Sequence, residues 1–235
     1  KFLFMGDQAQ LPPIGEIKSP IWKIKEGSTL TKVMRHDNQI LALATTLRGL
    51  VDHPAPNFKL DSNNDGEEGV WKLTEGAFEA KILEAAELGW FSEPDKAKAI
   101  AWRNVTVDKL NKLIRGKIFN NPTELWLPTD RVLFAAPAYD LEDQKVASTD
   151  DEGVINRIAV EWHPIYGEMK IFRISITLDD GRPAIARVLH PDSVMAFSQK
   201  LAALSDKARA NRRFWKEFWS FKDAFHNLRY SYALT

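Results

Sequence analysis

Hydrophobic residues recur along the chain with two periods, and the first of these predicts amphipathic helices. Apolar residues return every three or four positions over residues 37–51, where Asp37 is a candidate N-cap, and over residues 78–89, where Gly89 is a candidate C-terminal stop. The same spacing follows Thr106, a candidate N-cap for a third helix. The apolar positions of the three helices are Ile40, Ala44, Leu47 and Val51; Phe78, Ile82, Ala85 and Ala86; and Val107, Leu110, Ile114 and Ile118. Each helix is expected to present one apolar face.

The second period, in which apolar and polar residues alternate, predicts strands. Residues 1–5 are expected to form a buried strand, and residues 98–102 a strand that leads into the third helix, an order typical of an α/β layer. Alternation dominates between residues 122 and 191, where the Asp-Asp-Gly sequence at 179–181 predicts a hairpin turn because glycine tolerates a positive φ. The strands expected in this region are 131–134, 154–160, 172–178 and 184–189.

Helical spacing returns over residues 194–208 and 214–225, and residues 230–234 are expected to form a last strand. The order α/β, then β, then α/β predicts a small antiparallel barrel inserted into an α/β domain. The aromatic side chains of the second helical segment have two interpretations. Trp215, Trp219 and the neighbouring phenylalanines could stack on nucleic-acid bases, but their regular spacing favours a packed helix face.

Composition limits the class of protein. The chain has 235 residues, of which 44% are hydrophobic, enough for one large domain or two small ones with an ordinary core. It contains no apolar run of about 18 residues, so no membrane span is expected, and no secretory leader is recognisable. The absence of cysteine excludes disulfides, thiolate zinc sites and cysteine nucleophiles. A cytoplasmic location is therefore the expectation.

Charge is balanced overall but unevenly distributed. Lys+Arg and Asp+Glu both number 32, so net charge makes no case for nucleic acid. Residues 61–95 carry ten acidic side chains against two lysines, and this stretch should avoid phosphate backbones. Residues 193–235 carry eight Lys or Arg against three acids. That segment fits either a surface near a polyanion or a solvated helix face.

The strongest local signal is the sequence Gly-Asp-Gln-Ala-Gln-Leu-Pro-Pro from Gly6 to Pro13, which follows the first predicted strand. Glycine allows a sharp turn after a strand, and the polar side chains then enter the crevice where open α/β sheets bind ligands. Gly-Asp alone would be an ordinary surface turn, whereas the whole string is far more specific. It resembles motif III of superfamily 1 helicases in the RecD-like and phage Dda-like 5′→3′ branch. The resemblance implies that Gln10 senses the γ-phosphate of the nucleotide, while Gly6 and Asp7 shape the turn.

A second resemblance concerns residues 30–36, which look like motif IV of the same family, where an arginine reaches the γ-phosphate. It implies that Arg35 is an arginine finger. Phosphoryl transfer spreads negative charge over the equatorial oxygens, and a guanidinium that stabilises this charge typically accelerates the reaction by about 10³–10⁵. Without the resemblance, Arg35 would be one more solvent-facing charge. His36 stands where the family commonly has Gln, which leaves contacts at that position open.

A third resemblance links residues 100–104 and 107–111 to the strand-to-helix element in the second motor domain of the Dda-like group. A strand that ends in Arg103 and Asn104 and enters a helix offers donors suited to a DNA phosphate, although such polar junctions are also ordinary features of α/β folds. Residues 232–235 resemble the strand that leads into motif V. The matches follow the order of the family along the chain.

The resemblance implies a RecA-like α/β motor domain of the P-loop NTPase type with an inserted SH3-like barrel. The expected domains are the end of a first RecA-like domain at 1–27, the first part of a second at 28–121, the barrel at 122–191, and the second RecA-like domain continued at 192–235. No G-x-x-x-x-G-K-[ST] loop is present, and no magnesium-binding acidic pair precedes Gly6. The chain is therefore expected to be a fragment that does not hydrolyse ATP alone and binds no cofactor tightly. ATP and Mg²⁺ would be bound by the intact enzyme.

The resemblance implies that the chain is part of an ATP-dependent DNA helicase that moves on single-stranded DNA and unwinds duplex DNA, in the cytoplasm of a bacterial or phage-infected cell. Its expected partners are single-stranded DNA, an upstream motor domain with Walker A and B motifs, and a replication or repair protein, but no membrane. The alternatives are a non-catalytic adaptor that binds protein or nucleic acid on a degenerate helicase scaffold, and an RNA-directed motor. His163 and His190 each precede a proline without a second ligand at metal spacing, so both are expected to be structural.

Overall fold

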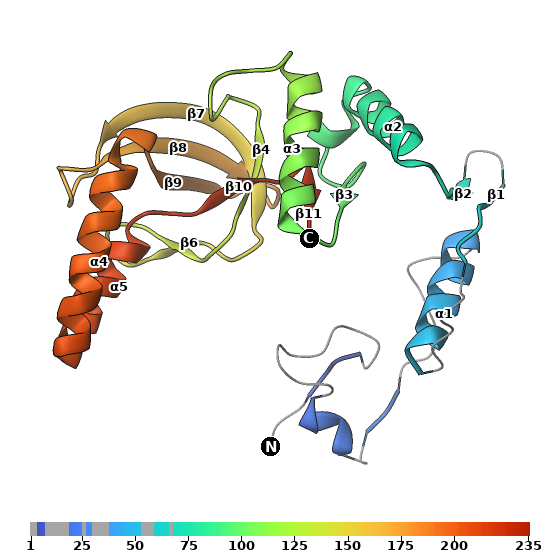
Figure 1. The fold of residues 1–235 in the computed structure, drawn as a ribbon, viewed down its shortest axis with the longest axis horizontal. Helices are drawn as coiled ribbons and strands as arrows, with labels where there is room; N and C mark the ends of the chain where they lie inside the picture. The colour runs from blue at the N-terminus through green and yellow to red at the C-terminus, as the bar shows by residue number, and fades with distance from the viewer. Residues whose placement is uncertain (1–3, 8–18, 25–26, 30–37, 53–58, 66–67) are drawn as a thin grey trace. The chain divides into compact units, whose positions relative to one another are not determined.

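A computed structural model of the chain describes residues 4–7, 19–24, 27–29, 38–52, 59–65 and 68–235. The described residues form a mixed α/β structure with five α-helices and several β-sheets (Figure 1). The chain divides into two compact units, residues 1–76 and 77–235. None of the helices in the described ranges is long and apolar enough to cross a membrane.

The first unit contains a 3-10 helix (η1, Pro20–Lys23), α1 (Asn38–Asp52) and an antiparallel pair of short strands, β1 (Asn63–Asp65) and β2 (Glu68–Val70). Helix α1 confirms the predicted periodicity, but its contact face differs from the prediction. Leu43 lines a groove together with Leu60 and Val70, because α1 packs against β2 on this side. The predicted apolar face is exposed instead: Ile40, Ala44, Leu47 and Val51.

The predicted buried strand at residues 1–5 is wrong for the two of its residues that the structure describes. Phe4 and Met5 lie outside any strand, and their side chains are 59% and 87% exposed. A strand needs a neighbour to satisfy its backbone hydrogen bonds. The described residues give Phe4 and Met5 no such neighbour.

The second unit contains an α/β layer built from segments far apart in the sequence. Strands β3 (Ala99–Ile100) and β11 (Ala233–Leu234) pair in parallel. They pack with α2 (Glu75–Glu87), the 3-10 helix η2 (Trp90–Ser92) and α3 (Asn104–Ile118). Gly89 adopts φ +75° two residues after the last residue of α2, so the predicted glycine stop is confirmed. The buried core of this layer comprises Ile82, Ala86, Phe91, Ala99, Val107, Leu110, Ile114, Tyr232 and Ala233.

An antiparallel sheet forms the second part of this unit, with strand order β10-β4-β7-β8-β9. Its strands are β4 (Arg131–Phe134), β7 (Glu152–Trp162), β8 (Lys170–Leu178), β9 (Pro183–Leu189) and β10 (Leu228–Tyr230). The predicted hairpin turn is confirmed, since Gly181 has φ +85°. A separate hairpin, β5 (Ala138–Tyr139) with β6 (Lys145–Ala147), shares the core of the sheet.

The predicted closed barrel is not found among the described strands. Strands β9 and β10 are the two edges of the sheet and do not pair with each other. The edge strand β10 also lies outside the predicted range 122–191, because it follows the C-terminal helices in sequence. The sheet therefore stays open and depends on a segment that the sequence pattern assigned to the α/β domain.

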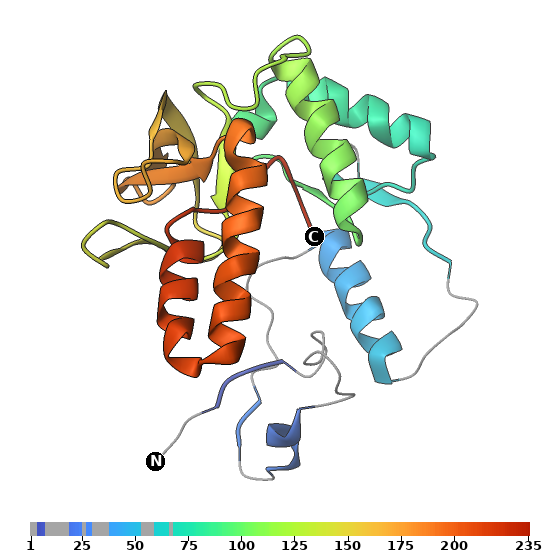
Figure 2. The same ribbon diagram turned by 60° about the vertical axis from the view of Figure 1, so that its left-hand side comes forward.

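Two antiparallel helices complete the unit: α4 (Val194–Ala210), preceded by the 3-10 helix η3 (Pro191–Ser193), and α5 (Trp215–Asp223), preceded by the 3-10 helix η4 (Arg212–Phe214). We call this pair the helical hairpin. Its turn lies at the end remote from the sheet in both views (Figures 1 and 2). Phe218, Phe221 and Phe225 pack into its core, as predicted, but the side chain of Trp219 is 47% exposed.

Candidate nucleic-acid interface

The carboxyl ends of β3 and β11 form the edge at which the predicted DNA-contacting residues lie. Ala99 pairs with Ala233 and Ile100 with Leu234 in parallel register, so both strands end at the same side of the layer. Ligands bind at the carboxyl ends of strands in open α/β sheets. Arg103 and Asn104 follow β3 at this edge, where α3 begins.

Helix α3 starts two residues before the predicted Thr106 cap. Arg103 occupies the N-cap position in an extended conformation (φ −116°, ψ 135°), and its carbonyl accepts hydrogen bonds from the amides of Thr106 and Val107. Thr106 therefore lies inside the first turn, and the predicted cap is wrong. Within the described residues, the amides of Asn104 and Val105 have no protein acceptor. These two donors are available at the positive end of the helix dipole.

The side chains around this helix start are unusually exposed. Trp102 is 82% exposed, Val105 80% and Ile100 74%, and the side chains of Arg103 and Asn104 also face solvent. A guanidinium and helix amides suit a phosphate, and an exposed indole suits a base. The structure brings Arg103 and Asn104 together with Trp102, which the sequence analysis had counted only as part of the strand.

A buried asparagine holds β11 in place beside α3. The Nδ2 atom of Asn111 donates to the Ala233 carbonyl at 3.1 Å, and its Oδ1 accepts from the Ala233 amide at 2.8 Å. These two bonds satisfy the backbone amide and carbonyl of Ala233, as hydrogen bonds to a neighbouring strand would. Asn111 had no predicted role, although a signal exists: it is one of two polar residues, with Arg115, among the buried residues of α3, beside Val107, Leu110 and Ile114.

The loop before β4 is tied to the same layer by a buried ion pair. Arg115 of α3 donates to both carboxylate oxygens of Asp130, at 2.8 and 3.0 Å. Asp130 also accepts from the Leu127 amide at 2.7 Å and from the Tyr232 hydroxyl at 2.9 Å. Burial, followed by the charge of Asp130, raises the pKa of Tyr232, so its hydroxyl stays protonated and remains a donor.

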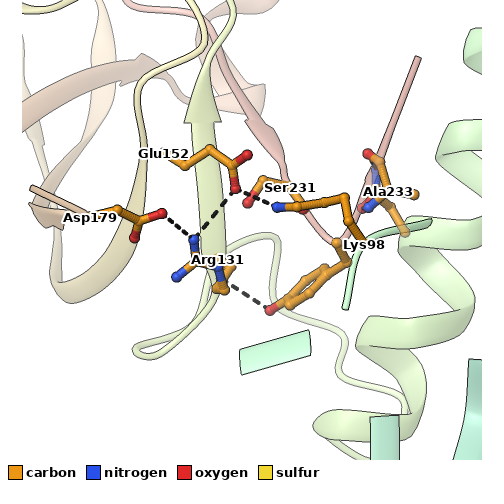
Figure 3. A network of polar contacts seen from close by, with 8 residues as sticks. Lys98, Arg131, Glu152, Asp179, Ser231 and Ala233 are labelled. Carbon is orange, nitrogen blue, oxygen red and sulfur yellow. Dashed lines mark hydrogen bonds and ion pairs between the residues drawn. The ribbon is translucent and has the colours of Figure 1, made fainter. Parts of the chain in front are cut away.

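A second polar network connects the sheet to β3 (Figure 3). The buried Arg131 guanidinium lies 2.5 Å from Asp179 and 3.4 Å from Glu152. Lys98, beside β3, lies 2.6 Å from the same Glu152 oxygen and donates to the Ser231 carbonyl at 2.9 Å. Cations and carboxylates compensate each other here, so the network acts as a structural joint between the sheet and the α/β layer.

The residues predicted to face the nucleotide belong to the first unit, and the structure describes only two of them. Gly6 packs against the Trp22 indole, where an added Cβ would come within 3.1 Å of the ring. Both carboxylate oxygens of Asp7 are held by Arg48, at 2.7 and 2.9 Å. Gln10 and Arg35 lie outside the described residues. Gly6 and Asp7 alone do not make a cradle for ATP and Mg²⁺, and we derive no chemical step through the nucleotide.

Both histidines predicted to be structural have local partners. His163 is buried, with Nδ1 accepting the amides of Ile165 and Tyr166 and Nε2 within 3.3 Å of the Ala224 carbonyl. His190 caps η3 by accepting the Asp192 amide. Each ring therefore stabilises a turn of the backbone.

Comparison with known proteins gives no family for this chain. No protein-family model and no curated protein matches it. Function is therefore inferred from the motifs and from the geometry of the β3–α3–β11 edge.

Proposed function

We propose that this chain is part of an ATP-dependent superfamily 1 DNA helicase or translocase of the RecD-like and Dda-like branch. We further propose that the β3–α3–β11 edge contacts the single strand along which the motor moves. The observation that carries the proposal is the parallel pairing of β3 with β11. The antiparallel sheet and the helical hairpin lie between these strands in sequence, as an insertion between adjacent strands of a motor domain requires.

The finer fold belongs to the same proposal. We assign the α/β layer to a second RecA-like domain, and the sheet with its β5–β6 hairpin to an SH3-like insertion. A single core that includes Trp126, Phe134, Ala147 and Ile174 supports the second assignment, because it unites the hairpin with the sheet. The two networks centred on Asp130 and Arg131 would then carry force between the insertion and the motor domain.

Each group at the edge has a distinct task in this proposal. The Arg103 guanidinium and the amides of Asn104 and Val105 bind one phosphate, since charge-assisted hydrogen bonds to phosphate position a strand without reading its sequence. The Trp102 indole stacks on an adjacent base. Sequence-independent contacts of this kind suit a protein that must move along its nucleic acid.

The contact is tested by fluorescence anisotropy with a labelled dT20 oligonucleotide. The variant Arg103→Ala should weaken binding about tenfold, because a charge-assisted contact to phosphate is lost. Arg182→Ala is the matched control, since Arg182 is an exposed arginine that pairs with Asp180 in the β8–β9 turn. Equal affinities of wild type and Arg103→Ala would contradict the proposed edge.

The motor itself is tested on a protein that includes the upstream sequence. We expect ATP hydrolysis stimulated by single-stranded DNA, and its loss in an Arg35→Ala variant, since an arginine finger typically accelerates phosphoryl transfer by about 10³–10⁵. Binding of dT20 without any DNA-stimulated hydrolysis would indicate the adaptor instead. Stronger stimulation by rU20 than by dT20 would indicate an RNA-directed motor.

A further inference from the structure

The outer face of α5 combines one exposed and one half-buried indole with cations that have no carboxylate partner in the described part of the chain. Trp215 and Trp219 lie one turn apart with ring centroids 6.4 Å from each other and planes 30° apart. Lys222 Nζ lies 4.7 Å above the Trp219 ring, and Arg212 precedes Trp215 by one further turn. Spacings of four and three place Trp215, Trp219 and Lys222 on one side of α5, and Arg212 belongs to the 3-10 helix η4 directly before it. We call the set Arg212, Trp215, Trp219 and Lys222 the indole stripe.

Packing within the hairpin accounts for only part of the stripe, since Trp215 and Trp219 each contact Phe218 edge-on, at 5.3 and 5.0 Å between ring centroids. The phenylalanines of α5 point toward α4, where Phe221 is buried and stacks on Phe197 at 5.1 Å. Trp219 is 47% exposed on the other side. An isolated exposed tryptophan needs no explanation, but two stacked indoles between two cations form an organised surface.

The charges near the turn are also unexplained by helix stability. Lys207 is neutralised by Glu217 at 2.8 Å, and it lies at the C-terminal end of α4, where the helix dipole favours a cation. Arg212, Arg213 and Lys216 lie before or within the first turn of α5, where the dipole disfavours a cation. Within the described residues, none of these three has a carboxylate partner. A polyanion would compensate all three.

We propose that the indole stripe is a second binding surface for single-stranded nucleic acid, separate from the β3–α3–β11 edge. Bases stack on Trp219 and on the exposed part of Trp215, while Arg212, Lys216 and Lys222 contact the phosphates on either side. Aromatic platforms flanked by cations bind single strands in this sequence-tolerant way. Duplex binds more weakly, because its bases are already stacked and leave only the charge contacts. This inference does not depend on ATP hydrolysis or on the helicase assignment.

The stacking contact is tested with labelled dT20 and the variant Trp219→Ala in the 235-residue chain. We expect a loss of affinity of about tenfold. Trp162→Ala is a close control, because Trp162 is also exposed, at 57%, and also lies beneath a lysine, Lys170 Nζ at 5.6 Å. It should leave the affinity unchanged. Equal losses in both tryptophan variants, or no loss in either, would overturn the proposal.

The charge contacts are tested by the salt dependence of dT20 binding. Replacing Arg212, Lys216 and Lys222 together by alanine should flatten the slope of log affinity against log salt by about two, since each phosphate contact on a single strand contributes about 0.7. In the control, three exposed lysines outside the helical hairpin, Lys96, Lys117 and Lys145, are replaced by alanine. This variant loses the same amount of positive charge from other parts of the surface. An identical slope in both triple variants would show non-specific attraction only, and the proposal would fail.

The two surfaces can be distinguished in the same assay. If the Arg103 variant binds weakly while the Trp219 and triple variants bind like the wild type, the inference about α5 is wrong and the β3–α3–β11 edge stands. If instead the Trp219 and triple variants bind weakly while the Arg103 variant binds like the wild type, the proposal for the β3–α3–β11 edge is wrong and the inference about the indole stripe stands. If the wild-type chain does not bind dT20, both are wrong.

Discussion

The guanidinium of Arg115 and the carboxylate of Asp130 form a two-fold hydrogen-bonded ion pair in the interior of the second unit. The exposed fraction of the Arg115 side chain is 9%, and that of Asp130 is zero. The pair connects helix α3, which begins at the candidate nucleic-acid edge, to the loop that leads into the sheet. Each partner is therefore needed to neutralise the other away from water.

Removing one partner of the Arg115–Asp130 pair should lower the free energy of unfolding more than removing both partners. Arg115→Met leaves the Asp130 carboxylate buried without its cation, and we expect the free energy of unfolding to fall by about 3–5 kcal/mol. Asp130→Asn should lower the free energy of unfolding by a similar amount, because it leaves the Arg115 guanidinium buried without its carboxylate. In the double variant the two losses should be far from additive, as urea unfolding of all four proteins can measure. Additive losses would show that the pair has no coupling.

Substitution of Gly153, in strand β7 of the antiparallel sheet, should destabilise the protein. A Cβ on Gly153 would lie 2.4 Å from the Thr177 carbonyl oxygen and 2.9 Å from the Leu178 Cα, both backbone atoms of β8. Gly153→Ala should therefore destabilise the protein by about 1–3 kcal/mol. Gly167→Ala is the control, because open space surrounds that position, and its effect should stay within about 1 kcal/mol. Thermal unfolding compares the two, and equal melting temperatures would contradict this packing.

His226 should make stability depend on pH. Burial, followed by the Arg187 charge, lowers its pKa from 6.5 to about 4. Its Nδ1 accepts the Arg187 amide at 3.2 Å and Nε2 donates to the Tyr139 carbonyl at 3.0 Å, an arrangement that only the neutral ring can make. Between pH 6.5 and 4 the unfolded chain binds the proton more readily, so stability is complete above pH 6.5 and falls as pH falls through this window.

The expected loss from His226 is about 3 kcal/mol between these limits. The measurement is urea unfolding at several pH values, with His226→Gln as the comparison. The variant should lose stability less steeply over the same window. Parallel curves for the two proteins would show that the ring is not held neutral. His163, whose pKa burial also lowers, contributes the same sign in both proteins and cancels from the difference.

Trp102 should affect binding without affecting folding. Its side chain is 82% exposed, so Trp102→Ala should change the free energy of unfolding by no more than about 0.5 kcal/mol. If the indole stacks on a base, the affinity for dT20 should fall about tenfold. Trp71→Ala provides the control from the other compact unit, with an indole that is 46% exposed. Unchanged affinity in Trp102→Ala would leave Arg103 and the helix amides as the only contacts of the edge.

Local chemistry accounts for the elements that sequence analysis predicted correctly. Strand β4 has the predicted bounds, Arg131–Phe134, and the β8–β9 hairpin turns at Gly181, because a glycine with positive φ specifies a turn from a few adjacent residues. Helix α2 ends before Gly89 for the same kind of reason. The N-cap of α3 was misplaced by three residues, since Arg103 occupies the position expected for Thr106 and its carbonyl accepts the amides of Thr106 and Val107.

The candidate site was only partly visible in the sequence. Arg103 and Asn104 were predicted from a strand that runs into a helix, and the structure puts them at the shared end of two parallel strands. The exposed indole of Trp102 beside them could not be inferred, because exposure depends on what packs against β3. For Gln10 and Arg35 the prediction stays a prediction, as neither lies in the described part of the chain.

The sequence by itself determined where most helices and strands form, because hydrophobic period, turn glycines and caps act over a few residues. Only the tertiary structure decided which strands pair with each other and which side chains become buried. Residues 230–234, predicted as one strand, divide between two sheets: β10 pairs antiparallel to β4, and β11 pairs parallel to β3. The burial of Arg131 and the exposure of Trp219 were decided in the same way. Strand pairing and burial depend on contacts between distant segments, which no local pattern of residues encodes.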